Sequence, residues 1–457
     1  MMEGTLAQAS AIMQGTLHGN DAAFRGIGTD SRKVAAGELF FALQGPKFDG
    51  NDFVPQAATA QAAGAVVNKT LDVNLPTIEV SDTRRALGQL AAAWRKRMPA
   101  ALIGLTGSNG KTTLKELIAN CLSLAAPTLA TRGNLNNDIG VPLMLAEIGP
   151  QHRYAVIELG ANHPGEIAYL TSLATPQVAV ITNAGPAHLE GFGDIEGVAH
   201  AKGEILQGEP RPEWAVLNAD DAFFAYWKSL ASDVRVITFG FGAAADVRAV
   251  DVKVTDTGSA FRLVMPRGEQ SIELPLAGRH NVAHACAAAA VAFVLGAETD
   301  TIRQGLAEAK AVTGRLQALS GIAGATVFDD SYNANPASVI AAAEFLASRP
   351  GAGWLVLGDM RELGNESGAL HRAVGEAAKR AGVLRLFAAG TQSREAVAAF
   401  GTEGCWFDSV EALIAALVRE LERHGSNDAQ NINVLVKGSR GMRMERVVQA
   451  LTHERRE

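Results

Sequence analysis

Short, mostly apolar segments recur along the chain, and helix-like stretches lie between several of them. The clearest are residues 101–105 (ALIGL), 154–159 (YAVIEL), 178–182 (VAVIT), 214–218 (WAVLN) and 234–239 (VRVITF). A strand that is apolar on both faces must be covered on both faces, and apolar strands that alternate with helices form βαβ units. The sequence therefore predicts an α/β protein built on mostly parallel sheets.

The pattern changes between residues 247 and 276, where apolar and polar residues alternate and PRGE at 266–269 marks a turn. This alternation is typical of antiparallel strands with one covered face. Beyond residue 314 the apolar segments return, for example at 354–359 (WLVLGD) and 432–438 (INVLVKG). We therefore expect a second α/β unit of Rossmann-like type in this part of the chain.

These changes divide the chain into three predicted domains. At roughly 100–200 residues per domain, 457 residues leave room for more than one. We expect a small N-terminal α/β domain at 1–99, with strand-like pieces at 37–43 and 64–68. A central domain with a mostly parallel sheet plus antiparallel strands follows at 100–313, and the Rossmann-like domain occupies 314–457.

Composition narrows the class of protein. Hydrophobic residues make up 47% and charged residues 19%, as in a globular protein with a substantial core, and the formal net charge is −7. No basic block suggests nucleic acid or an anionic membrane as a partner, and the uncharged apolar stretch 282–297 is too short to span a bilayer. We interpret that stretch as a buried helix. Sparse cysteines (Cys121, Cys286, Cys405) indicate a reducing compartment, so we expect a cytoplasmic protein, and nothing suggests more than a monomer.

The strongest local motif is TGSNGKTT at residues 106–113, which follows a predicted strand and precedes a helix-like segment. Backbone N–H groups at a helix start bind anions, and glycines let the backbone approach a phosphate closely. Lys111 can reach the β- and γ-phosphates, and the Thr112 hydroxyl can ligate Mg²⁺. The strict P-loop pattern requires glycine where Leu105 stands, so a glycine-rich turn with a surface lysine is the alternative. The residues expected around the phosphates of ATP are Gly107, Ser108, Asn109, Gly110, Lys111, Thr112 and Thr113.

This loop and a series of further motifs resemble the Mur ligase family, in which TG-x-x-GKT[T] is the usual phosphate loop. The further motifs occur in the family's order: GNLNNDIGVP (133–142), ELGANHPGEI (158–167), ITNAGPAHLEGFG (181–193), AKGEI (201–205), AGRHNVAHACAA (277–288), GR (314–315), DDSYNANP (329–336), LGDMRELG (357–364) and VKGSRGMRME (436–445). Within the family, GNLNNDIGVP, DDSYNANP and VKGSR resemble the member that adds D-alanyl-D-alanine. A run of ordered motifs is far more specific than the loop alone.

The resemblance implies an ATP-dependent ligase that adds D-alanyl-D-alanine to UDP-N-acetylmuramoyl-tripeptide through an acyl phosphate, the last cytoplasmic step of the peptidoglycan precursor. It leaves open whether the tripeptide ends in diaminopimelate or lysine. Two alternatives remain. One is another ligase with the same core, such as the third-residue-adding enzyme or a folylpolyglutamate synthetase. The other is a P-loop switch or motor ATPase, against which the motifs outside the loop weigh.

Candidate metal and catalytic residues follow the predicted strands. Glu158 ends a strand at its carboxyl edge, where ligands bind in open α/β sheets and a carboxylate can hold Mg²⁺. The resemblance implies that His188 is a second metal ligand, although chemistry alone favours oxygen ligands, and that Lys202 becomes a carbamate able to bind Mg²⁺. The expected metal set is therefore Thr112, Glu158, His188 and Lys202, and the expected catalytic set is Lys111, His188 and Lys202. The alternatives are a surface carboxylate, a solvated loop histidine and an ordinary surface lysine.

The resemblance also implies contacts to the rest of ATP. Asn281 matches the family's adenine-contacting asparagine, Asp330 the ribose-contacting residue, and Arg315 an arginine that reaches the phosphate from the C-terminal domain. Because Arg315 opens that domain, it would complete the site only when the domains close.

Substrate contacts are implied at both ends of the chain. Ser31 and Arg32 resemble a UDP-contacting pair, and residues 45–53 resemble the family's G-x-x-x-DGHDF loop with Asn51 where histidine is common. A helix cap is the alternative for the loop 329–336, and a solvated basic turn for 437–440. The full expected set of substrate residues is Ser31, Arg32, Lys47, Asp49, Asn137, Tyr332, Asn333, Asn335, Lys437, Ser439 and Arg440.

Overall fold

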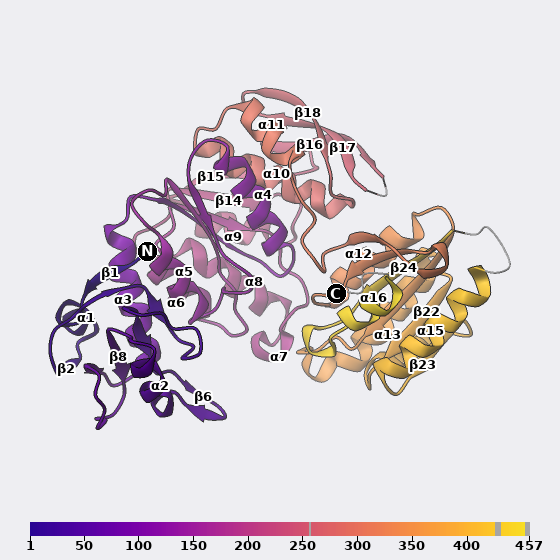
Figure 1. The fold of residues 1–457 in the computed structure, drawn as a ribbon. Coiled ribbons are helices and arrows are strands. Elements are labelled where there is room, and N and C mark those ends of the chain that lie inside the picture. Colours follow the sequence, from indigo (N-terminus) through magenta and orange to yellow (C-terminus); the bar gives the residue numbers. More distant parts are fainter. Residues whose placement is uncertain (256, 426–430, 453–457) are drawn as a thin grey trace.

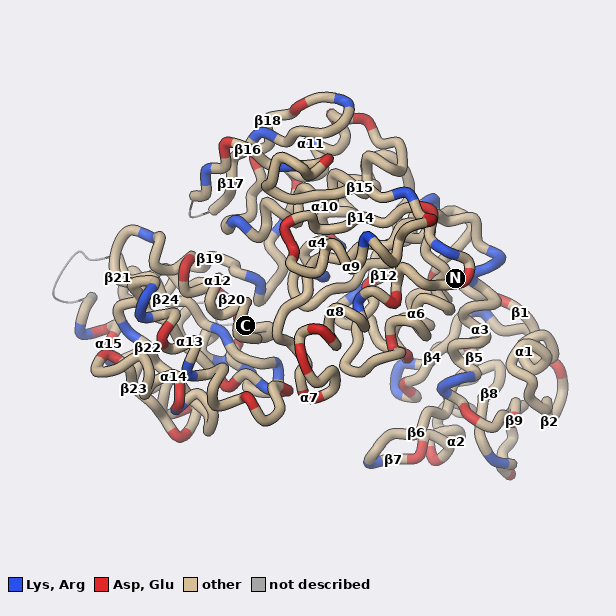
Figure 2. Tube along the Cα trace, turned by 180° about the vertical axis from the view of Figure 1, so that it is seen from behind, with Lys and Arg blue, Asp and Glu red and all other residues tan. Residues whose placement is uncertain are grey.

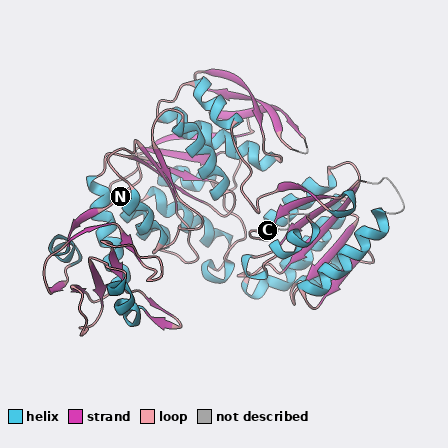
Figure 3. Cartoon of the chain, in the orientation of Figure 1, coloured by secondary structure: helices cyan, strands magenta, loops and turns pink. Residues whose placement is uncertain are grey.

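The computed structural model describes residues 1–255, 257–425 and 431–452. Over these residues the chain forms three successive α/β units, each built around its own main sheet (Figure 1). The last residues of the third predicted domain, 453–457, lie outside the described part. Helices cover the sheets in each unit (Figure 3), as the alternating pattern of the sequence predicts.

The N-terminal unit is a small mixed sheet. Its strands run in the order β2 (Thr16–His18), β9 (Thr77–Glu79), β8 (Gly64–Val67), β5 (Leu39–Phe41) and β4 (Ile27–Gly28). Only β2 among these strands pairs antiparallel. Shorter elements surround the sheet: β1 (Glu3–Thr5), α1 (Leu6–Met13), β3 (Ala23–Arg25), β6 (Gln44–Gly45), β7 (Phe48–Asp49), α2 (Val54–Thr59) and α3 (Thr83–Arg97). Asp82 caps α3, and one face of that helix joins the core beneath the sheet.

The central unit carries the predicted change of strand direction. Its sheet runs in the order β11 (Thr128–Ala130), β12 (Tyr154–Glu158), β10 (Ala101–Thr106), β13 (Val178–Ile181), β14 (Trp214–Asn218), β15 (Arg235–Gly240), β16 (Val247–Val254), β17 (Ser259–Met265) and β18 (Gly268–Leu274). The pairs from β11 to β16 are parallel, and β16, β17 and β18 pair antiparallel. The prediction is thus confirmed, except that β16 still runs parallel to β15.

Helices pack on both faces of the central sheet. One face is covered by α4 (Lys111–Ser123), α10 (Arg279–Val294) and α11 (Thr299–Ala307). The other face is covered by α5 (Gly140–Glu147), α6 (Glu166–Ala174), α8 (Ile195–Gly203) and α9 (Phe224–Leu230). The alanine-rich α10 is buried along almost its whole length, which confirms the prediction of a buried helix. In the described part of the chain, no helix has the length and apolar character needed to cross a bilayer.

The C-terminal unit is Rossmann-like, as predicted. Its sheet runs in the order β19 (Gln317–Ser320), β20 (Thr326–Asp330), β24 (Ile432–Lys437), β21 (Ala352–Gly358), β22 (Arg385–Ala389) and β23 (Gly404–Phe407). The pairs are parallel except β19 with β20. One face carries α12 (Pro336–Ala347), α13 (Ser367–Ala381) and α14 (Ser393–Phe400), and the other carries α15 (Val410–Gly425) and α16 (Glu445–Leu451).

The arrangement of the units brings two sheet edges together. The carboxyl ends of β10 and β12 lie in register, with Leu105 opposite Glu158, and in the C-terminal unit Asp330 lies opposite Lys437 at the ends of β20 and β24. The carboxyl edge of a parallel sheet is where ligands bind in α/β proteins. Basic and acidic residues are interspersed along the trace of all three units (Figure 2).

Candidate functional site

A glycine-rich loop joins β10 to α4 at the carboxyl edge of the central sheet. Gly107 has φ +146° and Gly110 has φ +79°, conformations that other residues rarely adopt. Space excludes side chains as well: a Cβ atom on Gly107 would lie 1.9 Å from Oγ1 of Thr182, and one on Gly110 would lie 1.9 Å from Nε2 of His284. The shape of this loop therefore requires both glycines.

The segment that follows β13 holds the loop in place. The backbone N–H of Ser108 donates to the carbonyl of Asn183 at 3.0 Å, and that of Asn109 donates to Oδ1 of Asn183 at 3.0 Å. Oγ1 of Thr182 donates to the carbonyl of Asn109 at 2.8 Å. These bonds fix the backbone of the loop before any ligand arrives, which reduces the ordering needed for binding.

Lys111 begins α4, and its Nζ donates to the carbonyl of Gly107 at 2.6 Å. Because the N-cap residue is Gly110, no capping side chain occupies the first N–H groups of the helix, which can therefore receive an anion. Burial lowers the pKa of the Lys111 ammonium, with Glu158 opposing the shift and Arg315 adding to it. The lysine thus lies in a partly desolvated position that a bound phosphate would compensate.

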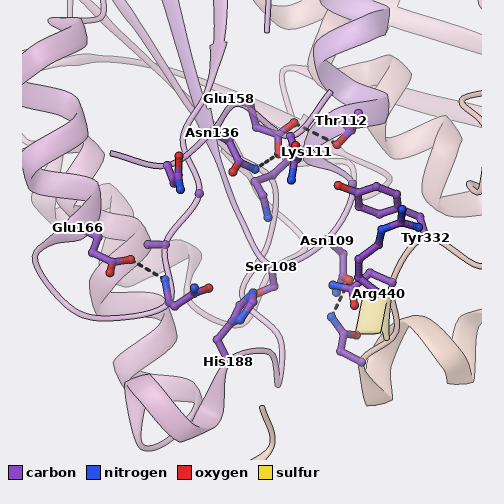
Figure 4. A pocket seen from close by; sticks show the side chains of 18 of the residues that line it. Ser108, Asn109, Lys111, Thr112, Asn136, Glu158, Glu166, His188, Tyr332 and Arg440 are labelled. Carbon is purple, nitrogen blue, oxygen red and sulfur yellow. Dashed lines mark hydrogen bonds between the residues drawn. The ribbon is translucent and has the colours of Figure 1, made fainter. Parts of the chain in front are cut away.

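A buried carboxylate lies beside the start of the same helix. Glu158 ends β12 and is 3% exposed. Its Oε2 accepts a hydrogen bond from Oγ1 of Thr112 at 3.0 Å, and its Oε1 accepts one from Nδ2 of Asn136 at 2.8 Å (Figure 4). A carboxylate and a hydroxyl are hard oxygen donors of the kind that Mg²⁺ takes together with phosphate oxygens. Thr112 and Glu158 therefore fit a magnesium ion bound next to a nucleotide.

The other two residues of the expected metal set are placed differently. His188 lines the same cavity as Thr112 and Glu158, with φ +56° at the start of α7 (Leu189–Phe192), and its Nδ1 pairs with a carboxylate oxygen of Glu362. Lys202 on α8 is 1% exposed and is absent from the described residues that line the cavity. Among the residues that the structure describes, no group of three or more His, Cys, Asp or Glu could hold a metal ion. The protein side chains alone thus form an incomplete ligand set.

Lys202 has an unusual environment for a lysine. Its Nζ lies 5.1 Å from the centroid of the Phe192 ring. Burial lowers the pKa of its ammonium to about 7, and the charge of Lys111 acts in the same direction, while Glu204 and Glu166 oppose it. Lys202 is thus a buried lysine whose charged form is disfavoured, and not a solvated surface cation.

Lys111, Thr112, Glu158 and His188 face a cavity of about 790 Å³ shared by the central and C-terminal units. From the central unit it is lined by residues that include Ser108, Asn109, Gly110, Lys111, Thr112, Asn136, Asn137, Glu158, Glu166 and His188. From the C-terminal unit it is lined by Arg315, Tyr332, Asn333, Asn335, Lys437 and Arg440, among others. Most of the expected ATP and substrate residues are therefore brought to one place.

Two arginines flank an aromatic ring on the C-terminal wall of the cavity. The guanidinium carbon of Arg315 lies 4.2 Å from the centroid of the Tyr332 ring, and that of Arg440 lies 5.8 Å from the same centroid. Stacking on an aromatic face restricts a guanidinium without neutralising its charge. The wall opposite the phosphate loop is therefore positively charged and ordered.

Asn335 connects the two walls. Its Nδ2 donates to Oδ1 of Asn109 in the phosphate loop at 2.8 Å, and its Oδ1 accepts from the backbone N–H of Ser338 at 2.9 Å, which caps α12. The helix cap considered as an alternative for this loop is thus present, and the same side chain also contacts the phosphate loop. Asn137 also bonds to a helix start, because its Oδ1 accepts a hydrogen bond from the N–H of Gly140, the first residue of α5, at 2.8 Å.

Other expected residues form hydrogen bonds with neighbouring protein groups. Nζ of Lys437 donates to Oδ2 of Asp330 at 2.6 Å and to the carbonyl of Asn333 at 3.1 Å. Oγ of Ser439 accepts from the N–H of Arg361 at 2.8 Å. Asn281 is buried, and its Nδ2 donates to the carbonyl of Ala277 at 2.7 Å. These contacts hold the 329–336 loop and the start of α10 in position beside the cavity.

The residues expected to bind UDP lie in the N-terminal unit, away from this cavity. Oγ of Ser31 donates to Gln56 at 2.8 Å, while Arg32 is exposed and forms an ion pair with Asp30 at 2.8 Å. A second cavity of about 410 Å³ lies between the N-terminal and central units and is lined by Asp30 and Arg132 among others. Ser31, Arg32, Lys47 and Asp49 are not among the described residues that line it.

The loop at 45–53 is held by its own polar residues. Lys69 lowers the pKa of Asp49 to about 2, and Asn51 adds hydrogen bonds to the same carboxylate. Nδ2 of Asn51 also donates to Oδ1 of Asn68 at 2.7 Å, so Asn51 ties the loop to the chain after β8. Lys47 is exposed at the turn. Asn51, where histidine is common in the family, therefore stabilises the loop from inside.

Several residues of the site were absent from the expectations. Asn136 binds Glu158, Asn183 holds the phosphate loop, and Glu362 pairs with His188. All three residues lie within motifs quoted above, so the motifs marked the segments in which they would be found. Their partners lie 22, 74 and 174 residues away in the chain, and spacing within a motif does not reveal such pairings.

The site combines a glycine-rich loop at the edge of a parallel sheet, a lysine at the start of the next helix and an arginine from a second α/β unit. These three features are typical of P-loop nucleotide-binding proteins whose site is completed by a neighbouring domain. Family models narrow this class: "Mur ligase middle domain" matches residues 105–292, "Mur ligase, glutamate ligase domain" matches 314–440, and "Mur ligase family, catalytic domain" matches 23–95. The chain belongs to the Mur ligase family. This membership removes a switch or motor ATPase as an alternative.

Individual relatives match over nearly the whole length. UDP-N-acetylmuramoyl-tripeptide--D-alanyl-D-alanine ligase of Escherichia coli (strain K12) is 47% identical over 452 residues, covering 99% of each chain. A crystal structure of MurF from Acinetobacter baumannii has a TM-score of 0.92 at 37% identity, covering 98% of each chain. The crystal structure of MurF ligase from Thermotoga maritima in complex with ADP has a TM-score of 0.82 at 27% identity, covering 93% of this chain and 96% of that one. The similarity therefore extends over all three units.

Proposed function

We propose that this chain is an ATP-dependent ligase that joins D-alanyl-D-alanine to UDP-N-acetylmuramoyl-tripeptide, an acid–amino-acid ligase of peptidoglycan synthesis. The observation that carries the proposal is the shared cavity, in which Lys111, Glu158 and Arg315 from two units surround one space. Near-full-length identity of 47% to a relative that bears this activity in its name supports the choice of substrates.

The reaction must overcome the poor reactivity of a carboxylate towards an amine in water. The terminal carboxylate of the tripeptide attacks the γ-phosphorus of ATP, which gives an acyl phosphate and releases ADP. The amine of D-alanyl-D-alanine then attacks the acyl carbon, phosphate leaves, and the ammonium proton is lost to a base or to water. Both steps bring anionic groups together, so positive charge must be supplied at the transferred phosphoryl group.

The residues of the cavity match these requirements. Lys111 and the first N–H groups of α4 bind the β- and γ-phosphates, and Arg315 approaches from the C-terminal unit. Thr112 and Glu158 would hold Mg²⁺, which would supply positive charge beside the phosphate oxygens. Asn281 and Asp330, at the start of α10 and the end of β20, are proposed to contact the adenosine portion.

The remaining proposals concern the metal set and the substrates. His188 would be a further ligand of the metal, and the neutral amine of Lys202 would react with CO₂ to form a carbamate and release one proton. Tyr332, Asn333 and Arg440 meet the peptide end of the substrate. Lys437 and Ser439 stabilise the C-terminal wall of the cavity through their hydrogen bonds and approach the peptide carboxylate. Ser31, Arg32, Lys47 and Asp49, all in the N-terminal unit, bind the UDP end of the substrate.

We also propose that the domains span residues 1–99, 100–313 and 314–457 and that the protein acts as a monomer. A reaction that consumes ATP requires a compartment that supplies it, so we propose that the protein acts in the cytoplasm.

The proposal is tested by incubating the purified chain with ATP, Mg²⁺, UDP-N-acetylmuramoyl-tripeptide and D-alanyl-D-alanine. Mass spectrometry should find the pentapeptide product, and ADP release should require both substrates together. Replacing the dipeptide by a free amino acid or by glutamate tests the two rival ligases. Product from one of those, with none from the dipeptide, would assign a different substrate to the same fold.

A further inference from the structure

Two loops from different units meet beside the cavity. The first is the start of α7 in the central unit, and the second is the segment 360–364 that follows β21 in the C-terminal unit. Nδ1 of His188 pairs with Oε2 of Glu362, and the backbone N–H of Glu190 donates to the carbonyl of Glu362 at 3.2 Å. One side-chain contact and one backbone contact therefore connect the two units at the same residue, Glu362.

The loop that carries Glu362 is anchored independently of this contact. The N–H of Met360 donates to Nε2 of the buried His371 at 3.0 Å, and the N–H of Arg361 donates to Oγ of Ser439 at 2.8 Å. Met360 and Leu363 are buried in the core of the C-terminal unit. Glu362 itself has φ +63°, a conformation that is unfavourable for a residue with a long side chain. The surrounding anchors maintain this conformation, which turns the carboxylate towards the central unit.

The loop that carries His188 is anchored in the same way. Leu189 and Phe192 are buried in the core of the central unit, and His188 has φ +56°. The rings of His188 and Phe192 form an edge contact with centroids 6.5 Å apart. The position of the imidazole is thus restricted by its own unit, whereas its hydrogen-bonding partner belongs to the other unit.

We propose that Glu362 is a positioning residue that orients His188 and selects its tautomer, and that it does so only when the C-terminal unit has docked. An ionised carboxylate can only accept hydrogen bonds, so Nδ1 of His188 carries the proton. In the neutral imidazole, Nε2 is then the nitrogen with a free lone pair. His188 lines the cavity, so docking of the C-terminal unit prepares a basic nitrogen at the site.

The expected size of each effect favours a positioning role for Glu362 over a contribution to fold stability. The side chains of His188 and Glu362 are 27% and 54% exposed. Ion pairs at such exposure contribute little to stability. Carboxylates that orient a metal-binding histidine, in contrast, typically change affinity or activity by roughly 10–100-fold when removed. Loss of Glu362 should therefore affect the reaction far more than the unfolding temperature.

The kinetic part of this inference rests on the proposed function, whereas the tautomer part does not. The experiment uses Glu362→Ala and Glu362→Gln, with Glu366→Ala as the matched control. Glu366 lies at the end of η4 (Gly364–Glu366), is exposed like Glu362, and takes no part in the contact between the two units. The same charge is thus removed four residues away without touching the contact between the units.

The first measurement is the nitrogen NMR spectrum of the full chain labelled in its histidines, with His188 assigned by comparison with His188→Gln. We expect the Nδ1-protonated form of His188 in the wild type and in Glu366→Ala, and a shift to the Nε2-protonated form in Glu362→Ala. The same tautomer in all of these proteins would overturn the inference, whether or not the chain makes the proposed product.

The second measurement is steady-state kinetics on the proposed substrates. Glu362→Ala should lower kcat by roughly 10–100-fold with a smaller change in KM for ATP. Glu362→Gln keeps an acceptor oxygen and should recover part of the rate. A wild type that makes no product would reject the proposed function and leave the tautomer result to decide the inference. A wild type that makes product while Glu362→Ala turns over like Glu366→Ala would reject the inference alone.

Discussion

The histidine that packs against the phosphate loop is buried in an unusual way. The ring of His284 occupies the space where a side chain on Gly110 would lie, and its Nδ1 has no hydrogen-bond partner among the described residues. Burial lowers the pKa of this imidazole from its ordinary value of 6.5 to about 3, and His280 and Arg315 act in the same direction. His284 is therefore neutral in the fold at physiological pH, and its protonation opposes folding.

This shift predicts a pH dependence of stability with a definite sign. Because the folded state takes up the proton only near pH 3 and the unfolded state near pH 6.5, His284 contributes stability above pH 6.5 that is lost as the pH falls towards 3. At about 1.4 kcal/mol per pH unit, acidification from neutral pH to about pH 5 should cost the wild type roughly 2 kcal/mol through this group. Urea unfolding of wild type and His284→Asn at both pH values measures the difference. An equal acid sensitivity of the two proteins would contradict the shift.

The position of candidate residues could be predicted from the sequence where a local motif carries the chemistry. Motifs identified the loop 106–113, Glu158 and Arg315, and the structure places residues 108–112 of the loop with Glu158 and Arg315 around one cavity. The sequence did not predict which residues pair across the units. The pairs Asn109–Asn335 and His188–Glu362 depend on how separate sheets face each other. The role of Asn51 also needed the structure, since its bond to Asn68 forms only in the folded loop.

At the scale of elements, α12 shows how one cap serves two purposes. Asn335 lies at its N-terminus, with Pro336 as the first helical residue, and a reciprocal bond to Ser338 completes a capping box. The free amide nitrogen of the same side chain reaches the phosphate loop. The start of this helix is therefore fixed both to its own first turn and to the central unit.

Two substitutions at Asn335 should separate these purposes. Asn335→Ala removes the cap and the contact to Asn109, so it should lower the free energy of unfolding by about 1 kcal/mol and weaken nucleotide binding. Asn335→Ser keeps a capping oxygen but is too short to reach Asn109, so it should retain stability and still bind nucleotide more weakly. Chemical denaturation and calorimetric titration with an ATP analogue measure the two effects. Full nucleotide affinity in Asn335→Ser would show that the contact to Asn109 has no part in binding.

The sequence predicted the positions of strands and helices more accurately than the directions of the strands. The apolar runs predicted at 354–359 and 432–438 correspond to β21 and β24, and the alanine-rich run became the buried α10. The change from parallel to antiparallel pairing falls one strand later than alternation suggested, because β16 begins beside the end of β15. Apolar–polar alternation reports one covered face and not the direction of the neighbouring strand.

At the scale of the whole molecule, the site belongs to two units joined through the segment that ends at Arg315. The phosphate loop is preorganised within the central unit, whereas the positive wall of Arg315, Tyr332 and Arg440 belongs to the C-terminal unit. Nucleotide bound in the cavity would contact both walls, so its binding energy is linked to the docking of the units.

Substitution of Arg315 tests this linkage. A hydrogen bond from a charged group contributes about 1.5–3 kcal/mol, so Arg315→Ala should weaken ATP binding by about tenfold or more. It should also reduce any compaction that an ATP analogue causes in small-angle X-ray scattering. Arg303→Ala is the control, because Arg303 pairs with Asp300 on the surface of α11. Equal affinity and equal compaction in Arg315→Ala and Arg303→Ala would mean that the C-terminal wall contributes nothing to nucleotide binding.

The hydrogen bond between Asn109 and Asn335 has a consequence for inhibition. A compound that inserted between these two amides would prop the units apart and stall turnover without resembling adenine, ribose or phosphate. Because nucleotide binding is linked to docking of the units, such a compound and the nucleotide would weaken each other's binding while occupying different places. Resistance would also be constrained, because the glycine-rich turn on one side and the capped helix on the other each tolerate few replacements.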